Sequence, residues 1–188
     1  MKNSTKNMVG MGLFTAIVVV LQLLGGGIRF GVFSISLVLV PIVVGAAVYG
    51  WKTGAWLGFA FGAAVLISGD AAAFLAIDPL GTVLVVLVKG IGCGLFAGLT
   101  YKLLHRLNNV VAVFAAAVVA PVVNTGIFLI GCRVFFWETI AEWGAALGFA
   151  NAADYAFLGL AGINFIIEIC VNLLLAPVIV RLIKVGKK

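Results

Sequence analysis

Four polar side chains stand in the middle of long apolar runs, where they could bind a small molecule. Asn164, Glu168 and Asn172 recur at four-residue steps, so a helix places them on one face within about 80°. At about 1.5 Å per helical residue, Lys89 lies about 15 Å and Glu168 about 18 Å from the outer ends of their runs. An isolated charge at that depth in a bilayer costs at least about 2.5–3.5 kcal/mol. We therefore expect Lys89 and Glu168 to meet.

A second group of residues could form the wall of a site for a partly aromatic, partly polar ligand. One helical face carries Asn124, Phe128, Gly131 and Phe135, with Asn124 about 18 Å from the outer end of its run. Two interpretations stay open. The lysine and the glutamate either form a structural ion pair, with the amides as interhelical hydrogen-bonding groups, or they line a substrate cavity.

Two arginines near the predicted outer surface are further candidates. Arg29 follows three glycines at 25–27, in an outer turn where its charge would either receive an anionic solute or face water. Arg133 is nine positions from Asn124, hence on the opposite side of an ideal helix, and close enough to the outer boundary to reach the interface.

Other chemical machinery is missing from the sequence. No Walker loop is present, and the single histidine, His105, is far from any serine in a nucleophile elbow. The acidic residues form no metal-binding run, and the three cysteines stand singly, which predicts buried free thiols. We predict no catalytic residue, no cofactor and no metal site.

The composition predicts an all-α integral membrane protein. Of the 188 residues, 64% are hydrophobic and 10% are charged, and the mean hydropathy is +1.29. About 20 apolar residues cross a hydrocarbon layer of about 30 Å, so a chain of this length leaves little room for a domain outside the membrane. We predict a single membrane domain, residues 1–188. We predict six transmembrane helices near 8–25, 33–50, 53–68, 80–104, 110–136 and 156–183. The segment 137–155 is expected to be an interfacial loop or short helix, and could be a lid.

The basic residues indicate the orientation of the chain. With six spans and a cytoplasmic N-terminus, nine lysines and arginines lie at inner ends and two, Arg29 and Arg133, lie outside; Lys89, in mid-span, completes the twelve. Cytoplasmic loops concentrate Lys and Arg, so both termini are predicted to be cytoplasmic. The net charge of +6 is thus a topology signal, and nucleic-acid binding is not predicted.

Three stretches of the sequence have a familiar pattern: residues 8–16 (MVGMGLFTA), the stretch 33–50 and the glycine-spaced run 54–62, within a six-helix chain of this size. In these stretches the chain resembles the substrate-binding S components of energy-coupling factor (ECF) vitamin transporters. The resemblance implies a vitamin-binding subunit of an ABC importer in the bacterial cytoplasmic membrane. It also implies three partners, an ECF transmembrane coupling subunit and two cytoplasmic ATPases.

The resemblance also implies roles for particular residues. The small face of the first helix that docks on the coupling subunit corresponds here to Gly12 and Ala16. The outward-opening vitamin site corresponds to Arg29, Lys89, Asn124, Asn164 and Glu168. With Phe128, from the shared helical face, these are the predicted substrate-binding residues. The second helix is most similar to the subgroup that includes pantothenate and folate binders, so pantothenate is the lead candidate, followed by folate or riboflavin. Two other functions remain as alternatives, an intramembrane lipid enzyme with Glu168 as general base and a self-contained small-solute transporter.

Overall fold

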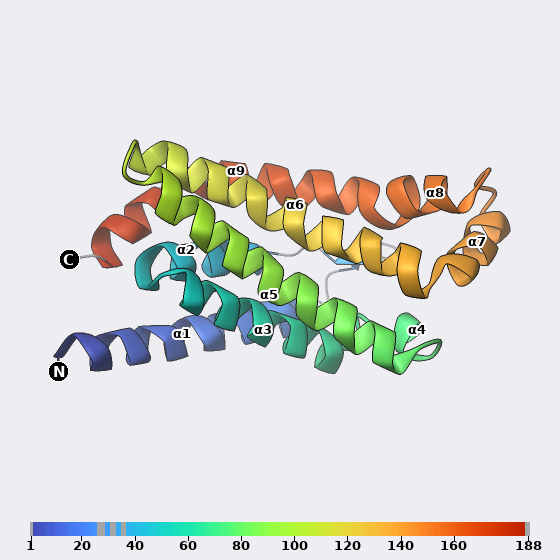
Figure 1. The fold of residues 1–188 in the computed structure, drawn as a ribbon, viewed down its shortest axis with the longest axis horizontal. Coiled ribbons are helices and arrows are strands. Elements are labelled where there is room, and N and C mark those ends of the chain that lie inside the picture. The colour runs from blue at the N-terminus through green and yellow to red at the C-terminus, as the bar shows by residue number, and fades with distance from the viewer. Residues whose placement is uncertain (1, 26–28, 31–32, 35–36, 187–188) are drawn as a thin grey trace.

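The structure, a computed structural model, describes residues 2–25, 29–30, 33–34 and 37–186 and is almost entirely helical (Figure 1). In chain order its elements are α1 (Lys2–Gly25), β1 (Arg29–Phe30), β2 (Phe33–Ser34), α2 (Leu39–Tyr49), α3 (Trp51–Ser68), α4 (Ala72–Leu75), α5 (Pro79–Leu104), α6 (Asn109–Phe135), α7 (Trp137–Ala146), α8 (Ala152–Asp154), the π-helix η1 (Tyr155–Gly162) and α9 (Ile163–Gly186). The predicted helical class is confirmed.

Among the described residues, four helices are long and apolar enough to cross a membrane: Asn7–Gly25, Pro79–Leu104, Asn109–Phe135 and Ala152–Ile183. The predicted count of six also includes α3, with 18 residues, and α2, with 11. Eight of the residues of α2 are buried inside the bundle. A short apolar helix that is covered on all sides is a core helix, which needs less length than a helix exposed to lipid.

The helix predicted over 33–50 is wrong at its start. Phe33–Ser34 forms the strand β2, which pairs antiparallel with β1 so that Arg29 lies opposite Ser34. The helix α2 begins only at Leu39. The run Phe-Ser-Ile-Ser at 33–36 alternates apolar and polar residues, which is the two-residue period of a strand.

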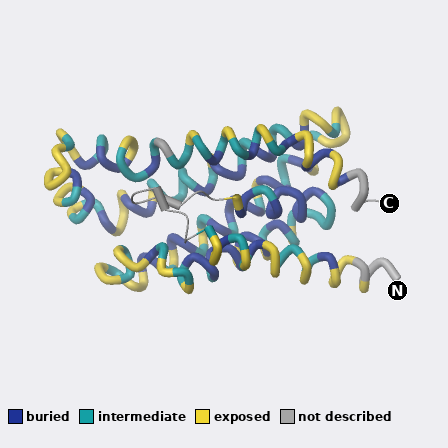
Figure 2. Tube along the Cα trace, turned by 180° about the vertical axis from the view of Figure 1, so that it is seen from behind, coloured by how far each residue is buried: buried dark blue, intermediate teal, exposed yellow. Residues whose placement is uncertain are grey.

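The long helices run along one axis, and the start of α1 and the end of α9 lie at the same end of the bundle (Figures 1 and 2). We call this the termini end. The short helices α4, α7 and α8 lie at the opposite end, here called the far end. Figure 2 shows exposed residues on the outer surfaces and buried residues on the faces that the helices turn toward one another.

Helix α5 begins at the Asp78-Pro79 dipeptide, one residue before the predicted start at 80. The Asp78 carboxylate accepts a hydrogen bond from the Gly81 amide at 3.0 Å, and Pro79 occupies the first helical position, where no N–H is needed. Helix α6 begins in the same way, because the side chain of Asn108 accepts from the amides of Val110 and Val111.

The four-residue glycine spacing closes the contact between α3 and α5. A Cβ on Gly58 would overlap the carbonyl oxygen of Gly90, and a Cβ on Gly54 would overlap that of Gly94. The two backbones therefore touch directly, as small residues permit between membrane helices. We call this contact the glycine seam.

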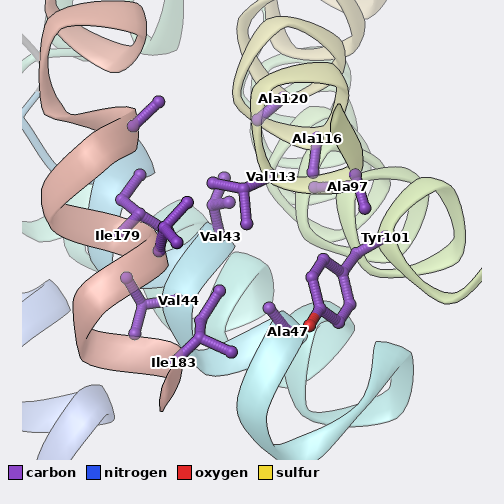
Figure 3. Close-up of a cluster of buried hydrophobic side chains, with 13 residues drawn as sticks. Val43, Val44, Ala47, Ala97, Tyr101, Val113, Ala116, Ala120, Ile179 and Ile183 are labelled. Carbon is purple, nitrogen blue, oxygen red and sulfur yellow. The ribbon is translucent and has the colours of Figure 1, made fainter. Parts of the chain in front are cut away.

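A second contact region fills the termini end with small and branched side chains. Helices α2, α5, α6 and α9 contribute to it, and Figure 3 shows Val43, Ala97, Ala116 and Ile179 among its members. Ala97, Ala116 and Ile179 have no exposed surface at all. We call this cluster the closed core.

Of the three cysteines, Cys93 and Cys132 are buried and free, as predicted, whereas the prediction is wrong for Cys170, which is exposed. Cys170 lies on α9 beside the buried Glu168 in sequence, but its position on the helix turns it outward.

Candidate ligand-binding cavity

A cavity of about 650 Å³ opens among α1, α3, α4, α5, α6, α7, η1 and α9. Its lining includes residues of α4, α7 and η1, so it belongs to the far end of the bundle. Its volume is within the range of about 300–1,000 Å³ that is usual for small-molecule sites.

Three helices bring the predicted polar residues to this one cavity. Lys89 comes from α5, Asn124 and Phe128 come from α6, and Asn164 and Glu168 come from α9. The side chain of Arg29, the sixth predicted ligand contact, lies outside the described residues. The structure thus places five of the predicted residues around a common space, and their role in binding stays a prediction.

Lys89 is the cation of the described lining. Its ammonium lies 5.4 Å from the centroid of the Phe128 ring and 6.0 Å from that of Phe61. The faces of these rings carry negative potential, so they stabilise a cation that burial would otherwise destabilise. The carboxylate of Glu168, only 6% exposed, lines the same cavity from α9. Lys89 and Glu168 thus line one cavity, and a direct contact between the two side chains stays a prediction.

Two buried amides lie near this charged group. Asn124 is 6% exposed, and its Oδ1 has no hydrogen-bond partner among the described residues. Asn172 is 1% exposed, and both atoms of its amide lack a partner among the same residues. A buried polar atom left without a hydrogen bond costs about 1–3 kcal/mol. Asn124 lines the cavity and Asn172 does not, so only Asn124 can satisfy its oxygen with a bound molecule.

Aromatic rings of α4, α6 and α7 and of the residue after α6 line one part of the cavity. The Phe74 ring, on α4, makes edge-on contacts with three others, at centroid distances of 5.8 Å to Phe128, 5.0 Å to Phe136 and 5.6 Å to Trp143. All four rings line the cavity. The sequence analysis missed Phe74, because a four-residue helix between two spans has too few residues to show a period.

Gln22 was also missed, although an amide in an apolar helix is a usable signal. It is 4% exposed, lines the cavity, and donates to the Asp70 carboxylate at 2.5 Å. Through this bond the end of α1 is tied to the turn that follows α3.

The predicted aromatic wall on α6 needs a correction. Gly131 packs against Val85 of α5, and Phe135 is 41% exposed; neither lines the cavity. The lining on this helix consists of Asn124, Thr125 and Phe128, and it continues in Phe136, which follows the helix. The contact with α5 determines which face of α6 turns toward the cavity, and this contact cannot be predicted from the sequence of α6 alone.

Three other predicted residues lie away from the cavity. Arg133 is exposed and its guanidinium lies 4.4 Å from the ring centroid of Trp137, in agreement with a position facing outward. Gly12 and Ala16 are exposed on α1, and a Cβ on Gly12 would meet no atom within 4 Å.

A comparison with protein families matches residues 6–180 to the family described as ECF transporter, substrate-specific component. The comparisons with curated proteins and with solved structures found no match. The family match covers nearly the whole chain, including every helix that lines the cavity.

Proposed function

Since the chain belongs to the family of ECF transporter substrate-specific components, we propose that its cavity binds a vitamin or related micronutrient for import. A substrate-specific component is a substrate-binding subunit of a multi-pass membrane transporter and not an enzyme. Membership of the family therefore excludes the lipid-enzyme alternative. A substrate-binding subunit needs a site for a small molecule, and we propose that this cavity is the site.

One observation carries the proposal: a cavity of about 650 Å³ joins a ring-rich part to buried polar groups at mid-depth. A water-filled polar channel would not need a lining of aromatic rings, and a contact between closely packed helices would not leave a cavity. A site of this mixed kind binds an organic solute by apolar contact and orients it by a few polar groups.

The proposed contacts are the residues of the lining that were predicted from the sequence. Lys89 and Glu168 supply charges, Asn124 and Asn164 supply amide hydrogen bonds, and Phe128 supplies a ring surface. Arg29, in the segment after α1, is proposed to complete the site from outside. The candidate vitamins are those that the resemblance implies, pantothenate, folate and riboflavin. Two of them, pantothenate and folate, are carboxylates that a lysine or arginine could neutralise.

We further propose six spans in the bacterial cytoplasmic membrane, with the termini end in the cytoplasm and the cavity open to the outside. The positions of Lys52, Lys102, Arg106 and Arg181, at or near helix ends, support this orientation.

The proposed partners are a transmembrane coupling subunit and two cytoplasmic ATPases. The ATPases would supply the energy of transport, since the sequence contains no Walker motif for binding ATP. The proposed docking face on α1 contains Gly12 and Ala16. Both are exposed, and together they leave a shallow surface on which another helix can approach closely.

The test is coexpression with the ECF coupling subunit and ATPases, followed by purification through a tag on this chain and binding measurements with a vitamin panel. We expect the four chains to copurify and one vitamin to bind. Gly12→Leu should abolish copurification without changing vitamin affinity, whereas Ile17→Leu, an exposed change on the same helix, should leave both intact.

Two results would contradict the proposal. The first is a well-folded chain that neither copurifies with the coupling subunits nor binds any vitamin. The second is uptake of the solute into liposomes that contain this chain alone, which would identify a self-contained transporter.

A further inference from the structure

We propose that the ligand is a planar heteroaromatic compound that directs a ring N–H or amino group at Asn124 and lays its ring among Phe74, Phe128 and Trp143. This inference rests on the proposed function of the cavity and narrows the substrate class within it. It separates ring-bearing micronutrients from aliphatic ones such as pantothenate.

The composition of the lining is the first reason. Six of the 23 lining residues are aromatic, about 26%, against 11% in the whole chain. They are Phe61, Phe74, Phe128, Phe136, Trp143 and Tyr155. Large aliphatic side chains are fewer, with three valines and one leucine. Since rings attract other rings in edge-on and offset geometries, this lining favours a ligand that is itself a ring.

The arrangement of these rings is the second reason. Phe74 holds its three partners at 5.0–5.8 Å in edge-on contacts, so the rings already have fixed orientations. Rigid aromatic side chains lose little conformational entropy when they bind. A flexible aliphatic ligand would gain apolar contact here, but it would lose its own rotational freedom and gain no ring geometry.

The level of the polar groups is the third reason. Counted inward from the end of α6 at about 1.5 Å per residue, Phe128 lies at about 10 Å and Asn124 at about 16 Å. A ring beside Phe128 therefore points its inner edge at the level of Asn124. The free Oδ1 of this side chain is an acceptor that needs a donor, which a ring N–H or amino group supplies in the plane of the ring.

The neighbouring charges fit the same class of ligand. Lys89 already contacts the faces of Phe61 and Phe128, and Glu168 shares its cavity wall. The cation is thus placed against π-systems and near a carboxylate. A ring that carries both donors and acceptors along its edge can use the lysine, the glutamate and the amides together.

The experiment compares the dissociation constants of riboflavin, folate and pantothenate for the purified full chain. Riboflavin and folate are the ring-bearing probes, and pantothenate is the aliphatic one. We expect at least one ring-bearing probe to bind tenfold or more tightly than pantothenate. Asn124→Ala should weaken that probe by about tenfold or more, because it removes a buried hydrogen bond, and Trp143→Ala should weaken it by about two- to tenfold.

Two matched controls keep the result specific. Asn172→Ala removes a buried amide that does not line the cavity, and Phe135→Ala removes a ring of α6 that does not line the cavity either. Both should leave the affinity of the ring-bearing probe within about twofold of the parent value.

Tighter binding of pantothenate than of both ring-bearing probes would overturn the inference, and so would a ring-bearing probe whose affinity survives Asn124→Ala. In both cases a vitamin still binds, so the proposed function stands. If no vitamin binds to a folded chain that also fails to copurify with its partners, the proposed function fails with the inference.

Discussion

At the termini end, α5, α6 and α9 face one another with alanine, valine and isoleucine, whereas at the far end the same three helices face one another with amides, charges and rings. Ala97, Ala116 and Ile179 are completely buried in the closed core. Lys89, about two turns from Ala97 along α5, and Phe128, about three turns from Ala116 along α6, line the cavity.

The difference follows from the sizes and polarities of the side chains. Alanines let helices come close enough that no space remains, and the glycine seam does the same for α3 and α5. At the far end, large rings that contact one another edge-on and two charged side chains line a cavity of about 650 Å³. One bundle therefore combines a closely packed termini end with a cavity at the far end, and substitutions can perturb the two ends separately.

The largest effect is expected at the far end, for Lys89→Ala. Without the lysine, the negative charge of the buried Glu168 carboxylate is no longer offset by a positive charge in the same cavity. We expect the free energy of unfolding to fall by about 3 kcal/mol. The double variant with Glu168→Gln should recover most of it. Thermal unfolding in detergent measures stability, and vitamin binding is measured on the same samples.

Two results would change the interpretation of this pair. A double variant that is no more stable than Lys89→Ala would show that the two charges do not compensate each other. A double variant that recovers both stability and full ligand affinity would make the pair purely structural.

The glycine seam should tolerate almost no bulk. Gly58→Ala places a methyl group on the Gly90 carbonyl, so the helices must separate, and we expect a cost near the upper end of about 1–3 kcal/mol. Gly126→Ala is the matched control, since its Cβ would meet no atom within 4 Å. Equal melting temperatures for the two variants would contradict a close-packed seam.

The tie between α1 and the turn after α3 should contribute less. Gln22→Leu removes the hydrogen bond to Asp70 but keeps the apolar stem. Bonds to a charged group contribute about 1.5–3 kcal/mol, and partial exposure of Asp70 places the expected loss at about 1.5 kcal/mol. Leu23→Val, an exposed neighbour, is the control in the same unfolding assay. If the free energy of unfolding of Gln22→Leu equals that of the parent chain, the hydrogen bond adds no stability.

The smallest effect is expected at the start of α5. Asp78→Ala removes the acceptor for the Gly81 amide, which should cost about 1 kcal/mol, whereas Asp78→Asn keeps an acceptor and should lose only a few tenths. Hydrogen exchange of the first turn of α5 measures the difference. Equal protection in the two variants would refute the capping role.

The sequence predicted the parts of the fold that depend on local signals. The predicted starts at 80 and 110 lie one residue from those of α5 and α6, where Asp78 and Asn108 cap the helices by local hydrogen bonds that need no tertiary information. The late start of α2 and the π-geometry of η1 were missed. The first needed recognition of a short strand period at 33–36, and the second depends on packing that leaves no signal in composition.

The site was predictable in depth and less so in direction. Counting residues from the span ends placed Lys89, Asn124 and Glu168 at one level, and all three line the same cavity. Phe135 was placed in the wall because it shares a helical face with Phe128, but its ring lies against Gly81 of α5, partly exposed, and does not line the cavity. Which side of a helix faces a cavity is decided by its neighbours.

Native mass spectrometry of the detergent-purified chain tests the central claim most directly, because it detects a ligand without assuming its identity. We predict an adduct with the mass of a vitamin, retained through purification or regained on soaking with a vitamin panel. Asn164→Ala should remove the adduct, and Phe157→Ala, an exposed change on η1, should retain it. A folded chain that carries no adduct after soaking, or one whose adduct is unaffected by Asn164→Ala, would contradict the assignment of this cavity as the vitamin site.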